Sequence, residues 1–121
     1  MPHLQLEYTK NIQTIINPIL FEQLFSILNK VADINLANCK SRSIQINDYQ
    51  IGSGNQKIGF VHLEIKILEG RGKEIRKQVG RESMEIMRSY FKEYTTKCNI
   101  QYSIEILEMK KEDYFTSNKL T

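Results

Sequence analysis

The sequence has no tryptophan, only two cysteines and two prolines, and no long apolar run. Two cysteines, Cys39 and Cys98, cannot form a disulfide framework and lack the spacing of a metal motif. No segment approaches the ~20 apolar residues of a membrane helix. The first residues show no basic and then apolar signal peptide. We therefore expect a cytoplasmic protein with reduced thiols, no membrane partner, no metal and no cofactor.

Length and charge narrow the class further. A chain of 121 residues has the length of a single domain, here 1–121, and can bury a core without covalent cross-links. The net charge is +3, and no block of five or more basic residues occurs. This balance is weak for a nucleic-acid partner, and none is expected, but it is compatible with a small anionic ligand.

Four segments alternate between apolar and polar residues with a period of two, which is typical of half-buried strands. In three of them the apolar set is plain: Leu4, Leu6 and Tyr8; Val61, Leu63, Ile65 and Ile67; Ile100, Tyr102, Ile104 and Ile106. In the remaining segment, 41–48, the same pattern predicts that Arg42, Ile44 and Ile46 face the core and that Gln45 and Asn47 face away.

Two helices are predicted, one between the first and second of these strands and one between the third and fourth. Asn17 is a good N-cap, and Pro18 follows at the first helical position, where its missing N–H costs nothing. Leucines and other apolar residues then recur at helical spacing up to Val31. A longer amphipathic pattern predicts the second helix from Lys73 to about Tyr94.

The order is therefore β-α-β, a glycine-containing turn at 51–57, and β-α-β. We predict an α+β fold in which two similar halves, about 1–50 and 58–108, form one four-stranded mixed sheet, followed by a tail, 109–121. Each crossover makes its own strand pair parallel, and both helices should cover one face. The other face is mostly polar; it could lie in solvent, which the residues slightly favour, or line a wet interior between subunits.

This topology predicts that one end of the sheet gathers Pro2, Lys40, Arg42 and Arg71. Pro2 is in phase with Leu4, so it should lie on the apolar side. If Met1 is removed, Pro2 carries a free amine, and burial and nearby cations would both lower the pKa of that amine. A base that titrates near the working pH suits proton transfer, and the cations could hold a substrate carboxylate.

These residues carry a resemblance to a known family. The segments "PHLQLEYTKNI", "KSR" and "GFVHLEIKILEGRGKEIRKQVG" resemble the 5-carboxymethyl-2-hydroxymuconate isomerases of the tautomerase superfamily. The resemblance implies a homotrimer and an isomerase of aromatic-compound catabolism that moves a proton in a muconate-like di- or tricarboxylate, with Pro2 as general base. The resemblance also assigns substrate binding to Arg71. The family commonly has "RSR" where this chain has "KSR", so its second substrate-binding arginine falls on Lys40, with Arg42 as the alternative.

Other readings remain open at this point. The chain could be a tautomerase of another 2-hydroxydienoate or a phenylpyruvate-like acid, or a ligand-binding domain without a base. An RNA-binding sheet is disfavoured, since only Phe60 is aromatic on the polar face. We interpret His3, which points away from Pro2, and His62 in mid-strand as structural.

Overall fold

The computed structural model describes residues 2–94 and 98–117; Met1 and the last four residues of the predicted tail lie outside this range. The helices and strands follow in the predicted order. They are β1 (His3–Thr9), α1 (Pro18–Ala32), β2 (Lys40–Ile46), β3 (Ile58–Leu68), α2 (Lys73–Phe91) and β4 (Asn99–Met109). Short 3-10 turns lie at Lys10–Ile12 (η1), Leu36–Asn38 (η2), Lys92–Tyr94 (η3) and Lys111–Asp113 (η4).

Helix α1 begins as its sequence predicts. The side chain of Asn17 accepts a hydrogen bond from the backbone N–H of Ile19 at 2.9 Å, and Pro18 occupies the first helical position. The helix ends at Asp33, which adopts a left-handed conformation and donates its N–H to the carbonyl of Leu28. Helix α2 also begins as predicted, but its regular part ends at Phe91, and residues up to Tyr94 form the tighter turn η3.

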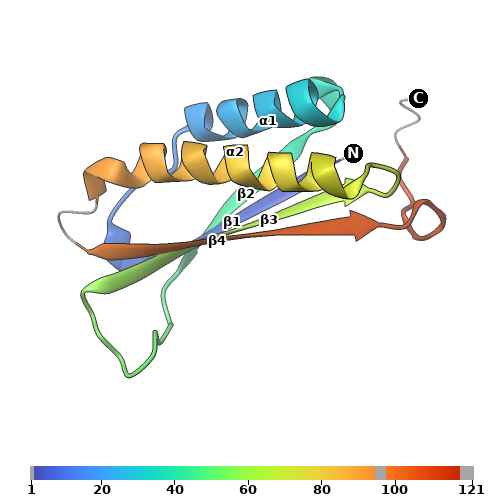
Figure 1. Ribbon diagram of the computed structural model, residues 1–121. Coiled ribbons are helices and arrows are strands. Elements are labelled where there is room, and N and C mark those ends of the chain that lie inside the picture. The colour runs from blue at the N-terminus through green and yellow to red at the C-terminus, as the bar shows by residue number, and fades with distance from the viewer. Residues whose placement is uncertain (1, 95–97, 118–121) are drawn as a thin grey trace.

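The four strands form one mixed sheet in the order β2-β1-β3-β4. The pairs β1–β2 and β3–β4 are parallel, and the central pair β1–β3 is antiparallel. Figure 1 shows both helices side by side on one face of this sheet, as predicted. Strands β2 and β3 follow each other in the chain, yet β1 lies between them, so the connection at 47–57 has to cross the end of β1.

Strand parity is confirmed in three strands and wrong in one. In β1, β3 and β4 the predicted apolar residues face the helices, with Leu4, Leu63 and Ile65 fully buried. In β2 the register places Arg42 opposite Gln5 and Ile44 opposite Glu7. Paired residues project from the same face, so Arg42 and Ile44 lie on the open face, and Ile44 is 43% exposed.

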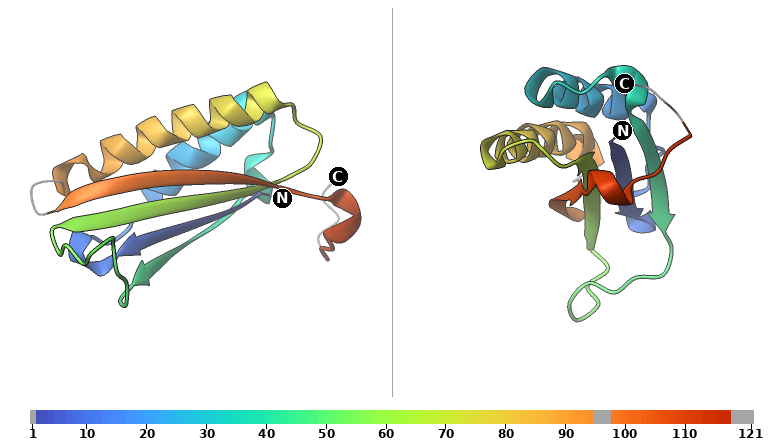
Figure 2. Two further views of the ribbon diagram at one scale, coloured as in Figure 1. Left: turned by 60° about the horizontal axis from the view of Figure 1, so that its bottom comes forward. Right: turned by 90° about the vertical axis from the view of Figure 1, so that its right-hand side faces the viewer.

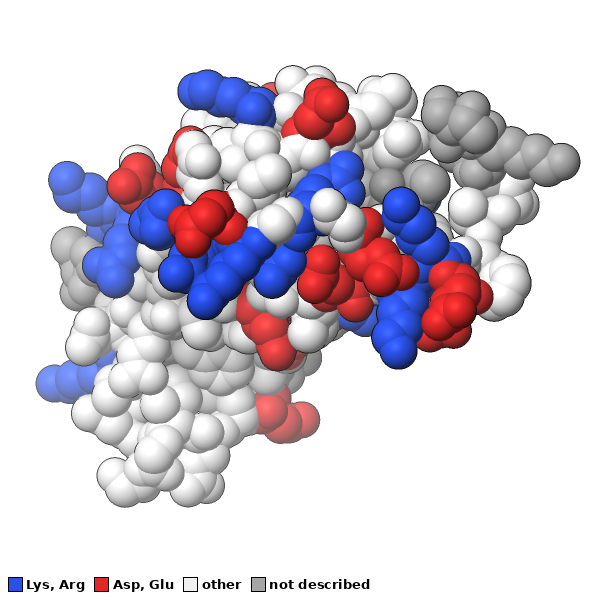
Figure 3. Space-filling view, turned by 45° about the vertical axis from the view of Figure 1, so that its right-hand side comes forward, with Lys and Arg blue, Asp and Glu red and all other residues white. Residues whose placement is uncertain are grey.

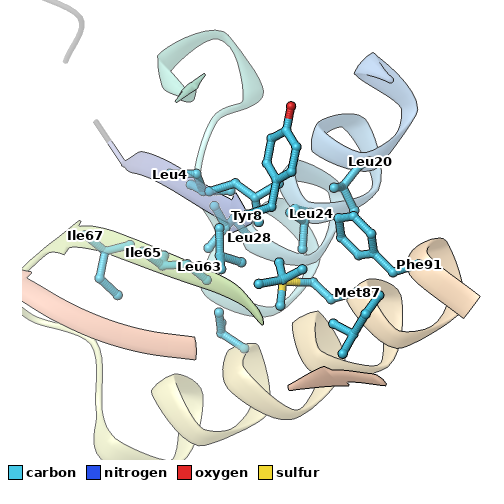
Figure 4. Packing of buried hydrophobic residues seen from close by; sticks show 14 of the residues in the cluster. Leu4, Tyr8, Leu20, Leu24, Leu28, Leu63, Ile65, Ile67, Met87 and Phe91 are labelled. Atoms are coloured by element: carbon cyan, nitrogen blue, oxygen red, sulfur yellow. The ribbon is translucent and has the colours of Figure 1, made fainter. Parts of the chain in front are cut away.

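The core lies between the sheet and the two helices. Figure 4 shows side chains from β1, β3, α1 and α2 meeting there, among them Leu4, Leu24, Leu63 and Met87. Phe91 is fully buried and packs edge-on against Tyr90 at 4.9 Å between ring centroids. Within the described ranges, neither helix is apolar and long enough to cross a bilayer.

Gly59 lies where β3 passes closest to η1. A Cβ at this position would lie 2.9 Å from Thr9 Oγ1 and 3.0 Å from Ile12 Cγ1, and both of these side chains are fully buried. We expect Gly59→Ala to lower the free energy of unfolding by about 1–3 kcal/mol through overpacking. Gly80→Ala is the matched control: its Cβ meets Ile106 at an ordinary 3.5 Å, and alanine favours the helix. Urea unfolding that ranks Gly59→Ala at or above Gly80→Ala in stability would contradict this.

Candidate active site

Pro2 is buried at the tip of β1, on the helix side of the sheet, as its phase with Leu4 and Leu6 predicts. The carbonyl of Pro2 accepts a hydrogen bond from the N–H of Lys40 at 3.1 Å, which ties the first residues to the start of β2. Figures 1 and 2 show that η4 and the end of β3 lie at this same end. Segments far apart in the sequence therefore meet around the tip of β1.

Arg71 follows β3 and is held by its own chain at this end. Its Nε donates to the carbonyl of Ala32, at the end of α1, at 2.9 Å, and its Nη1 donates to the carbonyl of Leu68 at 3.4 Å. No carboxylate in the described part of the chain forms an ion pair with Arg71. These two hydrogen bonds fix the position of Arg71. Since a guanidinium has five N–H donors, Arg71 keeps donors that can bind an anion, and its positive charge is not balanced by any described carboxylate.

Lys40 and Arg42 do not share the side of Pro2. The register pairs Lys40 with His3 and Arg42 with Gln5, so both cations project from the open face. The prediction that one end of the sheet gathers four residues is correct for their place along the strands. The prediction that Arg42 shares the core face with Ile44 is wrong, because Arg42 projects from the open face, as Lys40 does, whereas Pro2 lies on the helix side.

His3, interpreted from the sequence as structural, and Tyr114, which the sequence did not single out, lie beside these cations. His3 Nε2 is 2.8 Å from the hydroxyl of Tyr114, and His3 Nδ1 is 3.3 Å from Nη1 of Arg42. Tyr114 follows η4, so the tail folds back across the first strand. The contact joins residues that are 111 positions apart in the sequence, so no hydrophobic periodicity or motif spacing could have predicted it.

The environment of His3 favours its neutral form. Partial burial lowers the pKa of the imidazole below its ordinary value of 6.5, and the positive charges of Arg42 and Lys40 lower it further. A guanidinium can only donate, so Nδ1 accepts from Arg42, and Nε2 carries the proton that it donates to Tyr114.

The lowered pKa of His3 has a consequence for stability. Below about pH 6.5 the unfolded chain binds a proton at His3 that the folded chain resists, so the free energy of unfolding falls as the pH falls through this value. Comparing thermal unfolding at pH 7.5 and pH 5 should show a smaller loss for His3→Gln than for the unsubstituted protein. An equal loss in both would contradict the proposed environment of His3.

Cys39 adjoins Lys40 but is a poor nucleophile. Burial raises the pKa of its thiol above the ordinary value of 9.0, although the charge of Lys40 acts in the opposite direction. Its Sγ lies 3.7 Å from the carbonyl of Asn35. The thiol is therefore protonated at neutral pH.

The face of the molecule that Figure 3 shows carries charges of both signs. In Figure 3 basic and acidic side chains are interspersed over the face in view, and its lower part is nearly free of charge. On this face, recognition of an anion has to come from the placement of individual donors, because the two signs of charge are mixed.

Comparison with known proteins gives a consistent result. The family described as 5-carboxymethyl-2-hydroxymuconate isomerase matches residues 2–121. A 5-carboxymethyl-2-hydroxymuconate Delta-isomerase of Escherichia coli is 28% identical over 121 residues, which cover 99% of this chain and 96% of that protein.

Solved structures agree in fold. A 5-carboxymethyl-2-hydroxymuconate isomerase from Deinococcus radiodurans R1 superposes with a TM-score of 0.84 at 27% identity, covering 98% of this chain and 90% of that one. A fused 4-OT protein described as a symmetric trimer superposes with a TM-score of 0.71 at 13% identity, covering 98% and 94%. With the tautomerase-like fold and a match over nearly the whole chain, the protein is an isomerase that belongs to the 5-carboxymethyl-2-hydroxymuconate isomerase family.

Proposed function

We propose that the protein isomerises a 2-hydroxymuconate-type acid, 5-carboxymethyl-2-hydroxymuconate in the first instance, with the amine of Pro2 as general base. The observation that carries this proposal is the burial of Pro2 at the tip of β1, at the same end of the sheet as Arg71, which is anchored and has no ion-pair partner among the described residues. The names of the relatives in Escherichia coli and Deinococcus radiodurans support the choice of substrate.

The chemistry needs one base and one anion-binding group. Once Met1 is removed, the Pro2 nitrogen takes the proton of the 2-hydroxyl group as the C2 carbonyl forms. The electron pairs of the conjugated double bonds shift, and the protonated amine of Pro2 gives its proton to a remote carbon, which restores the free amine, so that no atom is gained or lost. Arg71 binds the carboxylate next to the reacting centre and stabilises the negative charge that develops on the dienolate.

The direct test is an ultraviolet assay on processed protein with three acids: 5-carboxymethyl-2-hydroxymuconate, 2-hydroxymuconate and the enol of phenylpyruvate. We expect the highest kcat/KM for the first acid. A preference for phenylpyruvate would favour the second candidate, a tautomerase of an aromatic keto acid. No turnover of any of the three acids would contradict the proposed function.

We also propose that the chain assembles as a homotrimer. Two features support this: β2 is an edge strand, and Ile44 on its open face is 43% exposed, where a contact with a second copy would cover it. The structural neighbour described as a symmetric trimer is consistent with this assembly. Light scattering should give three times the chain mass of 14.2 kDa; a particle of the chain mass would contradict the proposal.

A further inference from the structure

A row of nitrogen-bearing side chains crosses the open face of the sheet beside the tip of β1. The register pairs His3 with Lys40 of β2 and with Lys66 of β3, so the three side chains project from the same face in one row. Adjacent strands are ~4.8 Å apart, and the row is therefore compact. Arg42 lies one row further along β2 and reaches back to His3.

Carboxylates balance only part of the positive charge of Lys40, Lys66 and Arg42. Lys66 Nζ lies 3.4 Å from Glu64 Oε1, which compensates that one lysine. Among the residues that the structure describes, no carboxylate forms an ion pair with Lys40 or Arg42. This end of the open face therefore retains positive charge that an incoming anion can use.

Tyr114 brings a neutral donor to the same place. Its hydroxyl accepts from Nε2 of His3, and the rings meet edge to face at 5.8 Å between centroids. Because the oxygen accepts this bond, its own O–H proton points away from His3 and can be donated to a ligand. Tyr114 and Arg42 bind opposite nitrogens of one neutral ring, so their remaining donors lie on either side of it.

Two donors on opposite sides of a ring suit two separate carboxylates better than a single one. We propose that the open face holds the two remote carboxylates of a tricarboxylate substrate on either side of the His3 ring, one at Arg42 and the additional one at the hydroxyl of Tyr114, with Tyr114 as the specificity-determining residue. This inference rests on the proposed function and extends it. The nitrogen of Pro2 is at the tip of β1, so an elongated acid can react there while its remote carboxylates lie on the open side.

The test compares Tyr114→Phe with the unsubstituted protein on two acids that differ by one carboxymethyl group. For 5-carboxymethyl-2-hydroxymuconate we expect KM to rise roughly ten-fold, with kcat little changed, because one hydrogen bond to a carboxylate is lost. For 2-hydroxymuconate we expect no change. Phenylalanine keeps the ring that packs against His3, so the tail should stay in place.

Tyr49→Phe is the matched control, since it removes a hydroxyl from a tyrosine whose ring packs edge-on against Phe60, at the other end of the sheet. It should leave both KM values unchanged. An equal rise of KM for both acids in Tyr114→Phe would mean that Tyr114 only holds the tail, and the subsite would be wrong. Unchanged KM values for both acids would overturn it as well.

A binding experiment separates this inference from the proposed reaction. Tricarballylate and glutarate differ by one carboxylate, and neither can undergo the isomerisation. Calorimetry should show tighter binding of tricarballylate to the unsubstituted protein and no such preference in Tyr114→Phe. That preference in a protein without isomerase activity would support the subsite and refute the proposed function. Equal affinities for the two acids in the unsubstituted protein would refute the subsite alone.

Discussion

Protein that retains Met1 is expected to lose isomerase activity by about 10²–10⁴-fold, the usual contribution of a general base. In that form the Pro2 nitrogen belongs to an amide, and its lone pair is delocalised into the carbonyl group, so it cannot accept a proton from the substrate. The measurement is the rate of matched samples with and without Met1, with intact mass confirming each.

The fold should survive this change. The core lies among β1, β3 and the two helices, and the hydrogen bond from Lys40 to Pro2 uses the Pro2 carbonyl rather than its nitrogen. Circular dichroism and light scattering on both samples provide the control. Equal rates for the two samples, with equal folding, would mean that Pro2 is not the base.

Arg71→Ala should lower kcat/KM by roughly 30- to 1,000-fold, corresponding to ~2–4 kcal/mol for the loss of a desolvated carboxylate partner. Both KM and kcat should change, because the guanidinium binds the acid before and during the proton shift. The variant should also be less stable by about 1–2 kcal/mol, since the carbonyls of Ala32 and Leu68 lose a donor.

Two variants separate these effects. Arg81→Ala removes an exposed arginine from the middle of α2 with the same change in net charge, and it should alter neither kinetics nor stability. Lys40→Ala should weaken the reaction less than Arg71→Ala, because Lys40 projects from the other face and offers a point charge rather than a fork. Unchanged kinetics in folded Arg71→Ala would remove this arginine from the site.

Local patterns in the sequence predicted most of the fold. The Asn17 and Pro18 start of α1 and the inward faces of β1, β3 and β4 are set by nearby residues and by a single apolar face, and the structure confirms them. The face of β2 could not be predicted in the same way. Its isoleucines alternate with polar residues, but its register comes from pairing with β1, which places Ile44 opposite Glu7.

The site was predictable only where topology determined it. The parallel pairing of β1 with β2 and the antiparallel pairing of β1 with β3 place the starts of β1 and β2 and the end of β3 at one end of the sheet. The sequence therefore correctly predicted that Pro2 and Arg71 lie at this end. It could not assign Arg42 to the open face, nor show that Tyr114 meets His3. That contact depends on how the tail folds after β4, and no periodic pattern in 110–117 specifies this path.

The most direct test of the central claim is to locate the unprotonated amine chemically. 2-Oxo-3-pentynoate is an electrophilic acid that reacts with nucleophiles and can use the same anion-binding groups as the substrate. Treating processed protein near pH 7 and mapping the product by peptide mass spectrometry should show one adduct per chain, on the Pro2 nitrogen, with activity lost in parallel. Cys39 is the competing nucleophile, and its raised pKa should protect it. An adduct on Cys39, or full activity with Pro2 modified, would contradict the assignment of Pro2 as the base.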